Sequence, residues 1–382
     1  MDGRKPLDEE SFTIGHYCGY FDGELHKVKF QKPNSGFTDN ILRTSKGLNF
    51  PVKLELNFKN ISSFCLSQGK IYYLDVDNNL MKLSPRGSPR KIHLNLGEGR
   101  QIEKIFVEPV HETLILLVCC KVFNVRQQEV VRWRDQSKLN TTEEDLYSFD
   151  VFEENEIVEY ISGTDTNGFV LTNLGRIWKI ENWNSRSSTW ALTVLPYPSR
   201  ISQIRCGKEH LIALTKEGQV LTMGKSTRGQ LGQGSTASHD TLQPVEVLEP
   251  LRFVQVAAGG WHSLVLSDSG DIYGWGWNES GQVGIHSDHN TNNRTLTKED
   301  IPKLIFSPTL LDTPLDVTFQ TISTGSRHSA GITTDGSVYF WGWNEYGQLM
   351  DQTNQYILIP TKNNTVEMKR VVCEGWSTLM FS

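Results

Sequence analysis

A repeated pattern in the C-terminal half of the chain is the feature that most constrains the fold. Segments 206–232, 258–284 and 324–349 share one order of glycine, histidine, apolar residues and a second glycine-containing turn, and they begin 52 and 66 residues apart. Each segment predicts a hairpin, because apolar residues alternate on both sides of a turn whose glycine can adopt positive φ. A lone hairpin is marginally stable in water, so the copies must pack against each other. The repeat predicts an all-β protein.

Weaker copies of the hairpin precede these segments, and the two chain ends complement each other. Residues 373–382 provide the first strand of a repeat, and residues 12–28 resemble its missing second half. Sharing one blade between the ends would remove exposed strand edges. We therefore expect a single seven-bladed β-propeller over residues 1–382, closed by pairing of the N- and C-terminal strands. The expected blades are 12–28 with 373–382, 50–84, 101–135, 157–185, 201–234, 253–285 and 319–351, with insertions at 136–156 and 286–318.

Composition limits the classes of function and compartment. The net charge is −6 and the N-terminal residues form no basic arm, so direct DNA binding is not expected. Six cysteines show no metal-ligand spacing, which favours a reducing compartment without disulfides. No signal peptide is visible, and the longest apolar run, 114–120, is too short to span a bilayer. We expect an intracellular protein that binds no membrane and is monomeric on its own.

The string GWHS at 260–263, followed by GDIYGWGWNESGQ at 270–282, resembles the repeat signature of the regulator of chromosome condensation family. The resemblance is specific in the last three segments and covers the first half only in layout. Resemblance to short, single-propeller members implies a nuclear, chromatin-associated protein, with the cytoplasm as a second location. It also implies a JmjC-domain demethylase/hydroxylase as partner, and roles in histone H3 methylation and chromosome segregation.

The three repeat histidines, His210, His262 and His328, invite a metal-site interpretation. Each occupies the same place in its own blade, so radial symmetry keeps them apart, whereas zinc needs several ligands about 2 Å from one ion. We expect each imidazole to bridge backbone groups of neighbouring blades, with no metal and no cofactor. The other expected structural positions of the repeat are Gly218, Gly270, Gly336, Gly224, Gly276 and Gly342.

Aromatic residues are candidates for contact with a partner. Trp275/Trp277 and Trp341/Trp343 alternate along their strands, so one of each pair faces each way. Packing between blades explains one member of each pair. The others, together with Trp261 and Trp376, could reach a face of the disc and act as binding hot spots.

Two segments depart from the repeat. Residues 141–159 carry eight acidic residues and no lysine or arginine, which fits either a solvated linker or a docking strip for a basic partner such as a histone. Residues 304–311 are too apolar for a free loop and would pack on the disc or beneath a partner. The candidate partner-binding residues are Glu143, Glu144, Asp145, Glu153, Glu154, Trp261, Trp277, Trp343 and Phe306.

The chain lacks the sequence motifs of common catalytic sites. It has no nucleophile elbow, phosphate-binding loop or HExxH motif. We therefore predict a non-catalytic scaffold that binds a JmjC chromatin-modifying enzyme and, as a further candidate, histone or another basic protein. The alternative is a guanine-nucleotide exchange factor for a small GTPase.

Overall fold

The computed structural model consists almost entirely of antiparallel strands, which pair into seven four-stranded sheets. Within the described residues, the short 3₁₀ helices η2 (Glu246–Leu248) and η3 (Lys298–Asp300) lie between strands. No helix in the part of the chain that the structure describes is long and apolar enough to cross a membrane. The structure describes residues 15–19, 52–54, 61, 63–67, 70–83, 89–94, 96, 100–108, 113–122, 125–134, 144–148, 152–153, 155–181, 183, 191–286, 296–314, 316–351 and 353–381.

The sheets follow one another in chain order, and within most of them the strands are also sequential. In the first half the strands are β3 (Ser63–Ser67), β4 (Lys70–Leu74), β5 (Leu80–Leu83) and β6 (Arg90–Lys91); β7 (Arg100–Glu108), β8 (Thr113–Val122), β9 (Val125–Arg134) and β10 (Glu144–Ser148); and β11 (Val158–Gly163), β12 (Gly168–Thr172), β13 (Ile177–Glu181) and β14 (Ala191–Leu195). In the second half they are β15 (Ile201–Cys206), β16 (His210–Thr215), β17 (Val220–Gly224) and β18 (His239–Pro244); β19 (Phe253–Ala258), β20 (His262–Ser267), β21 (Ile272–Trp277) and β22 (Leu304–Leu310); and β23 (Phe319–Thr324), β24 (His328–Thr333), β25 (Ser337–Trp343) and β26 (Tyr356–Glu367). The remaining sheet joins both ends of the chain and contains β27 (Arg370–Glu374), β28 (Ser377–Phe381), β1 (Gly15–Gly19) and β2 (Val52–Leu54).

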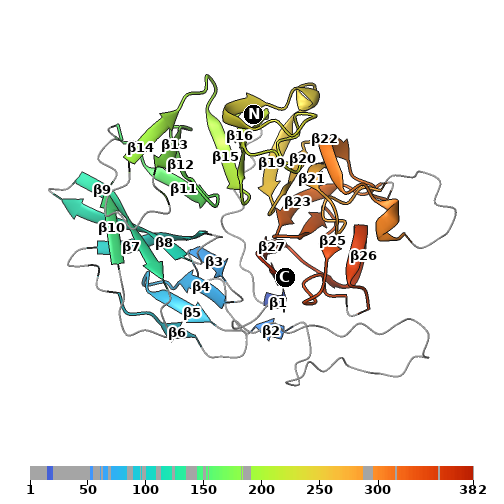
Figure 1. Ribbon diagram of the computed structural model, residues 1–382. Helices are drawn as coiled ribbons and strands as arrows, with labels where there is room; N and C mark the ends of the chain where they lie inside the picture. Colours follow the sequence, from blue (N-terminus) through green and yellow to red (C-terminus); the bar gives the residue numbers. More distant parts are fainter. Residues whose placement is uncertain are drawn as a thin grey trace.

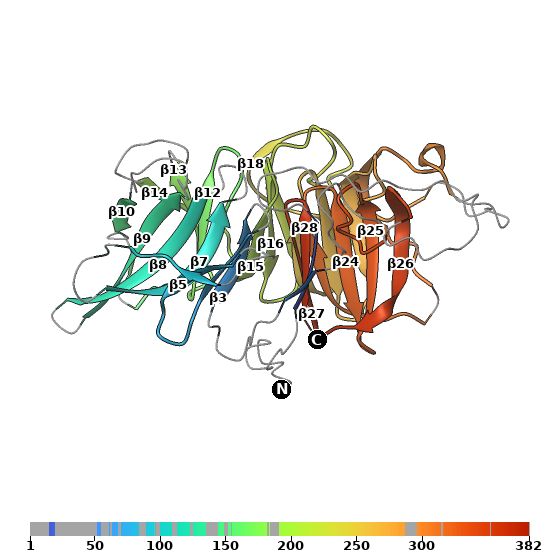
Figure 2. The same cartoon turned by 90° about the horizontal axis from the view of Figure 1, so that it is seen from below.

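The sheets stand around a common centre, as Figure 1 shows along the axis and Figure 2 from below. Apolar side chains fill the space between neighbouring sheets, and the largest cluster joins the sheets of β15–β18, β19–β22 and β23–β26 around Trp275 and Trp341. Leu379 and Phe381 of β28 pack against Leu66 and Ile71 of the β3–β6 sheet, so the last sheet also contacts the first. The core is therefore a continuous ring of inter-sheet clusters.

Hydrogen bonds between the innermost strands reinforce this ring. Polar side chains on these strands bond to the backbone of the neighbouring sheet, which satisfies groups that the four-stranded ladders leave unpaired. The bonds are Gln203 Nε2 to Val254 O at 2.9 Å, Gln255 Nε2 to Ile322 O at 2.8 Å, Cys373 N to Ser323 Oγ at 2.8 Å and Ile105 N to Ser63 Oγ at 3.1 Å.

The expectation of a seven-bladed propeller is wrong: the structure has five regular blades, and the two remaining four-stranded sheets differ from them. The five regular blades, in which the structure describes side chains on every strand, are β3–β6, β11–β14, β15–β18, β19–β22 and β23–β26. The β7–β10 sheet departs from them because its two central strands, β8 and β9, are ten residues long, whereas the central strands of the five regular blades have four to seven residues. The sheet that joins the chain ends departs because its strands come from both ends of the chain and β2 lies after a long connection from β1. In these two sheets the side chains of β1, β2 and β10 lie outside the described residues.

The expected boundaries change at three outer strands. Residues 144–148 of the expected acidic insertion form β10, paired with β9, and residues 304–310 of the second expected insertion form β22, paired with β21. Residues 52–54, expected in the 50–84 blade, pair instead with β1. Outer strands carry no repeated motif. Comparison of the repeats therefore assigns them to insertions, although each forms the edge of a sheet.

The pairing of the chain ends is present in the register of β1 and β28. Tyr17 pairs with Leu379, Cys18 with Thr378 and Gly19 with Ser377. Strand β28 thus lies between β27 and β1, and its two edges are both hydrogen-bonded.

Candidate functional site

One end of the sheets gathers the aromatic residues that do not enter the core. In an antiparallel sheet, the loop from the first to the second strand and the end of the third strand lie at the same end. Trp261 lies in the β19–β20 loop and Trp277 ends β21, while Trp343 ends β25 and Trp376 lies between β27 and β28. These four side chains therefore share one face of the propeller.

Two arginines of the same face lie between the tryptophans. The guanidinium carbon of Arg228 is 4.3 Å from the ring centres of both Trp261 and Trp277. That of Arg327 is 4.2 Å from the Trp277 ring and 5.5 Å from the Trp343 ring. Cations at these distances are attracted to the ring faces, most strongly where water is partly excluded. We call Trp261, Arg228, Trp277, Arg327, Trp343 and Trp376 the tryptophan–arginine row.

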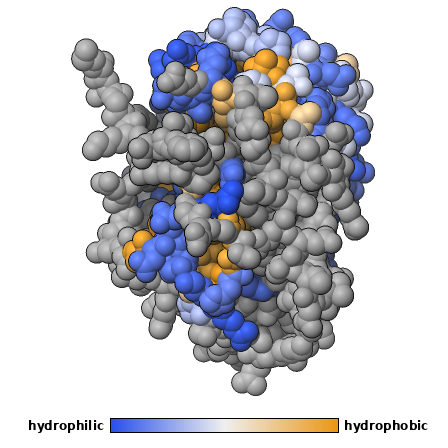
Figure 3. All heavy atoms as spheres, turned by 90° about the vertical axis from the view of Figure 1, so that its left-hand side faces the viewer, coloured by the Kyte–Doolittle hydropathy of each residue, from blue (hydrophilic) through white to orange (hydrophobic). Residues whose placement is uncertain are grey.

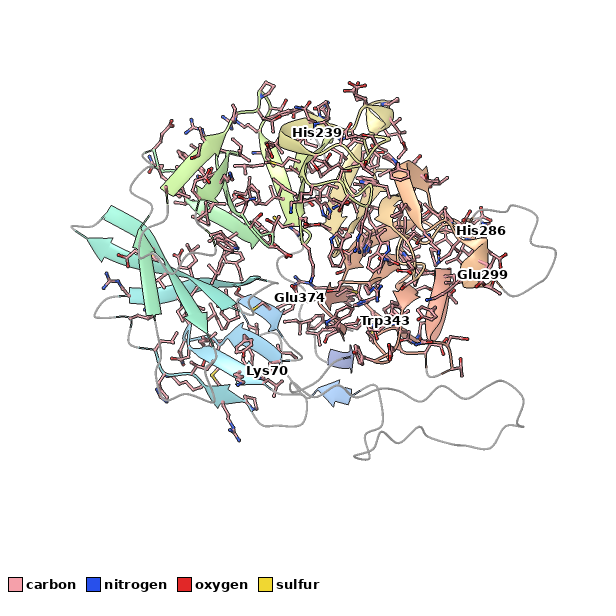
Figure 4. All side chains as sticks on the ribbon, in the orientation of Figure 1. Lys70, His239, His286, Glu299, Trp343 and Glu374 are labelled. Atoms are coloured by element: carbon pink, nitrogen blue, oxygen red, sulfur yellow. The ribbon has the colours of Figure 1, made fainter. Side chains whose placement is uncertain are left out.

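Edge-to-face aromatic contacts hold the two ends of the row. The rings of Trp261 and Trp277 lie 5.5 Å apart, and those of Trp343 and Trp376 lie 4.9 Å apart. Trp343 also contacts Tyr346 at 5.2 Å, and its side chain is only 7% exposed. Figure 4 labels Trp343 beside the β23–β26 sheet, to the right of the centre of the ring. Trp343 is thus an anchor for the row, whereas Trp261, Trp277 and Trp376 remain half-buried and available to a partner.

Charged groups flank the row unevenly. Lys208 Nζ lies 5.0 Å from the centre of the Trp261 ring, on which Arg228 also stacks. Glu209 accepts hydrogen bonds from Lys225 Nζ at 3.0 Å and from Trp261 Nε1 at 3.1 Å. Burial alone would raise the pKa of Glu209, but these two bonds lower it below its usual value, so Glu209 is a charged, fully engaged carboxylate.

Arg327 has a weaker partner of its own. Its Nη2 lies 3.8 Å from Glu279 Oε2, and the Glu279 side chain is 48% exposed. Burial lowers the pKa of Arg327, against the attraction of Glu279, yet a guanidinium remains charged throughout the physiological range. The row therefore presents permanent positive charge between aromatic faces.

The repeat histidines lie away from this row and join neighbouring sheets. Their Nε2 atoms lie within hydrogen-bond distance of hydroxyls on the following sheet, so the bridge runs through hydroxyl groups, with an additional backbone contact to Ser377 at His328. The pairs are His210 with Ser263 at 3.0 Å, His262 with Ser329 at 2.9 Å and His328 with Thr378 at 2.9 Å. Burial lowers the pKa of His210 to about 4 and of the other two to about 3, so all three are neutral. Among the described residues no group of three or more His, Cys, Asp or Glu side chains could hold a metal ion.

The repeat glycines allow the close approach that these histidines require. At Gly276 φ is +101°, and a β-carbon there would lie 2.5 Å from the carbonyl oxygen of Trp261. Gly224 and Gly342 meet the corresponding carbonyls in the same way. Gly218, Gly270 and Gly336 occupy the turns at the opposite end, also with positive φ.

The acidic segment does not lie beside the row. Glu153 is exposed and pairs with Arg176 at 2.7 Å, while Glu156 is buried and accepts hydrogen bonds from Thr172 Oγ1 and Trp178 Nε1. Glu144 and Asp145 belong to β10, where the structure describes the backbone, and Glu143 and Glu154 lie outside the described residues. Figure 3 faces this side of the molecule, where the described surface is mainly hydrophilic with separate apolar groups. Part of the acidic segment is therefore used in strand pairing and in local hydrogen bonds.

The last predicted aromatic, Phe306, lies on the outer edge of its sheet. Its side chain is 36% exposed on β22, beside the 37% exposed Leu304. A β-carbon on Gly229, which follows Arg228, would lie 2.9 Å from the Phe306 ring. Phe306 therefore lies at the rim and packs against the loop that contains Arg228, but it is not part of the row.

A second group of charges lies near the centre of the ring. The Arg205 guanidinium stacks on Tyr160 at 4.6 Å. Glu374, which ends β27, lies close to the centre in Figure 4. Burial raises the pKa of Glu374 to about 7, and the positive charge of Arg205 opposes that rise.

Three cations of this face, Arg228, Arg327 and Lys208, were not predicted from the sequence, although comparison of the repeats contains a signal for Arg327. The residue before each repeat histidine is Glu209, Trp261 or Arg327, and the residue after the third-strand glycine is Lys225, Trp277 or Trp343. These two positions vary between repeats, whereas the neighbouring histidine and glycine do not, and the variable side chains form the face that carries the tryptophan–arginine row.

Comparison with known proteins supports the repeat assignment in the second half. The pattern of the regulator of chromosome condensation (RCC1) repeat matches residues 217–266, 269–332 and 335–379, and a second description of this repeat matches 201–230, 253–282 and 319–348. The chain is 36% identical over 210 residues to RCC1 domain-containing protein 1 of Mus musculus and 34% identical over 212 residues to that of Homo sapiens. Each alignment covers 48% of this chain and 56% of the relative, so the chain spans about half the length of these relatives.

The similarity in structure extends further than the similarity in sequence. The crystal structure of Prp20p from Saccharomyces cerevisiae, a protein described with its binding properties to Gsp1p and histones, matches with a TM-score of 0.67. That match covers 97% of this chain and 91% of Prp20p at 18% identity, so it shows a common fold. The chain thus combines RCC1 repeats in its second half with an RCC1-like fold throughout.

Proposed function

We propose that this chain is a non-catalytic interaction scaffold of the RCC1-repeat type, which docks a chromatin-modifying JmjC enzyme and, as a further partner, histone. The tryptophan–arginine row is the observation that carries this proposal. Half-buried tryptophan and arginine side chains dominate the energetics of protein interfaces. The JmjC partner rests on the resemblance to short members of the family, and the histone rests on the fold shared with Prp20p.

The row is suited to protein binding because its side chains are already held in place. Ring contacts hold Arg228 against Trp261 and Trp277, and Arg327 against Trp277 and Trp343, so binding costs little additional side-chain entropy. A bound protein surface would cover the aromatic rings of the row and remove water from its cations. A nuclear location and a link to histone methylation and chromosome segregation belong to the same proposal.

Affinity purification of the full chain from nuclear extract, with mass spectrometry, tests the function. We expect a JmjC protein and histones with the wild type, and loss of the JmjC protein with Trp277→Ala. Trp178→Ala is the matched control, because Trp178 is half-buried on β13 and contacts Phe152 and Glu156, away from the row. Recovery of neither partner, or equal recovery of the JmjC protein by Trp277→Ala that melts like the wild type, would contradict the proposal.

The alternative exchange activity has its own measurement. The chain is mixed with a panel of small GTPases loaded with fluorescent GDP, and nucleotide release is followed. We expect release at the spontaneous rate. Strong acceleration for one GTPase would replace the scaffold function by guanine-nucleotide exchange.

A further inference from the structure

The chemistry of the row points to one kind of partner surface. We propose that the Trp261 end of the row docks a short acidic segment, rich in Glu or Asp, of a partner protein. This inference rests on the proposed function and adds the chemical character of the docked segment.

Arg228 and Arg327 each have a buried N–H group without a hydrogen-bond partner, and Arg228 also has no ion-pair partner among the described residues. In Arg228 the group without a hydrogen-bond partner is the buried Nη1. The guanidinium carbon lies 4.3 Å from both ring centres, and because these centres are only 5.5 Å apart, Trp261 and Trp277 cover adjacent sides of the group and leave other N–H donors for a ligand. A guanidinium edge matches a carboxylate with two parallel hydrogen bonds.

A second cation lies on the same ring. Lys208 Nζ and Arg228 both lie over Trp261, at 5.0 and 4.3 Å from its centre. Glu209, the nearby carboxylate, is engaged by Lys225 and by Trp261 itself. Glu209 also attracts Arg228 electrostatically, but Lys208, Lys225 and Arg228 outnumber this one carboxylate, so the surroundings of the Trp261 ring remain net positive.

The other end of the row is more nearly neutral. Glu279 lies 3.8 Å from Arg327, and Glu345 also attracts this arginine electrostatically. An acidic ligand would gain less there than beside Arg228. This asymmetry places the docked segment over Trp261 and the flanking Lys208 and Arg228.

The charge of the whole chain distinguishes an acidic peptide from other ligands. A nucleic acid is a long polyanion, and the net charge of −6 would repel it beyond the immediate contact. A basic peptide would place like charges against Lys208 and Arg228. A short acidic segment touches the positive end of the row and little else.

Fluorescence anisotropy with the full chain tests the inference. The probe is a labelled, Glu-rich peptide of about ten residues, compared with the same peptide carrying Gln for Glu, a Lys-rich peptide and a single-stranded oligonucleotide. We expect saturable binding of the Glu peptide alone, weakened by salt. Arg228→Gln should raise its Kd about tenfold, and Arg228→Lys should raise it less.

The matched control is Lys216→Gln, which removes one exposed positive charge from the turn after β16, at the opposite end of the sheet. We expect this variant to keep the wild-type Kd. The inference is overturned if the Glu peptide does not bind, if the Gln peptide or the oligonucleotide binds as tightly, or if Arg228→Gln has no effect. If the Glu peptide fails while Trp277→Ala still loses the purified partner, the scaffold function stands and this inference falls.

Discussion

His262 Nε2 on β20 lies 2.9 Å from Ser329 Oγ on β24, and Ser329 Oγ lies 2.8 Å from the carbonyl oxygen of Gln282. A carbonyl can only accept, so the hydroxyl donates to Gln282 and accepts from the histidine, which must carry its proton on Nε2. The serine of one sheet is thus held by two groups of the preceding sheet. His210, Ser263 and Gln230 repeat this arrangement one sheet earlier.

Replacing His262 by Ala should destabilise the ring. The variant loses a fully buried side chain and leaves the Ser329 hydroxyl without its donor, so we expect the free energy of unfolding to fall by about 3 kcal/mol. Urea denaturation measures the change. His93→Ala, at an exposed histidine, is the control. Equal midpoints for the two variants would refute the structural role of the histidine.

Acid should weaken the fold through the same histidines. Their pKa values are about 4, 3 and 3 in the folded chain, against about 6.5 when unfolded. As pH falls below about 6.5, the unfolded chain binds protons that the folded chain excludes. Above this pH the histidines therefore do not reduce the free energy of unfolding, and below it each histidine lowers that free energy by about 1.4 kcal/mol per pH unit.

Glu374 acts in the opposite sense. Its folded pKa of about 7 lies above the unfolded value, so its protonation favours the folded chain as pH falls through 7. We expect urea midpoints to fall between pH 6.5 and 4.5, and to fall more steeply in Glu374→Gln. A constant midpoint over this range, or a shallower fall in that variant, would contradict these assignments.

Trp183 has a structural role that a sequence pattern did not predict. A β-carbon at Gly168, where β12 begins, would lie 2.1 Å from Cε3 of the fully buried Trp183 ring. Gly168→Ala should therefore cost about 2–4 kcal/mol of stability in urea denaturation. Combining it with Trp183→Phe should cost less than the sum of the two single changes. Strict additivity would show that the clash is not the cause.

Removing β1 should expose an edge of β28. Deletion of residues 1–19 breaks the pairing of Gly15–Gly19 with Ser377–Phe381, and an unpaired edge promotes association. We expect a lower melting temperature and aggregation in light scattering. Deletion of residues 1–10 leaves β1 intact and is the control. Identical behaviour of the two deletions would count against this pairing.

The sequence predicted most accurately where residues do the same task in several sheets. His210, His262 and His328, with their glycines, recur because the three contacts that join the last four sheets need the same close approach. The outer strands β10 and β22 escaped prediction because an edge strand can pair through its backbone with almost any side chains. Trp183 escaped because one large ring fills a space that other sheets fill differently.

The row could be predicted only in part. Trp261, Trp277 and Trp343 stand out in the sequence as aromatic residues beside strand ends. Arg228 comes from the loop after β17 and Arg327 from the β23–β24 loop, and only the radial packing of neighbouring sheets brings them between those rings. Contacts between sheets depend on how the sheets are arranged around the centre, and the spacing of residues within one repeat does not predict that arrangement.

Hydrogen–deuterium exchange of the full chain, free and bound to the partner recovered from nuclei, tests most directly whether the row is the docking face. We predict slower exchange in the partner-bound chain at residues 207–210, 226–229, 259–262 and 325–328, which border the row. The turns at 216–218, 268–270 and 334–336, at the opposite end of the sheets, should be unchanged. Protection of those turns, with none beside the row, would contradict the account.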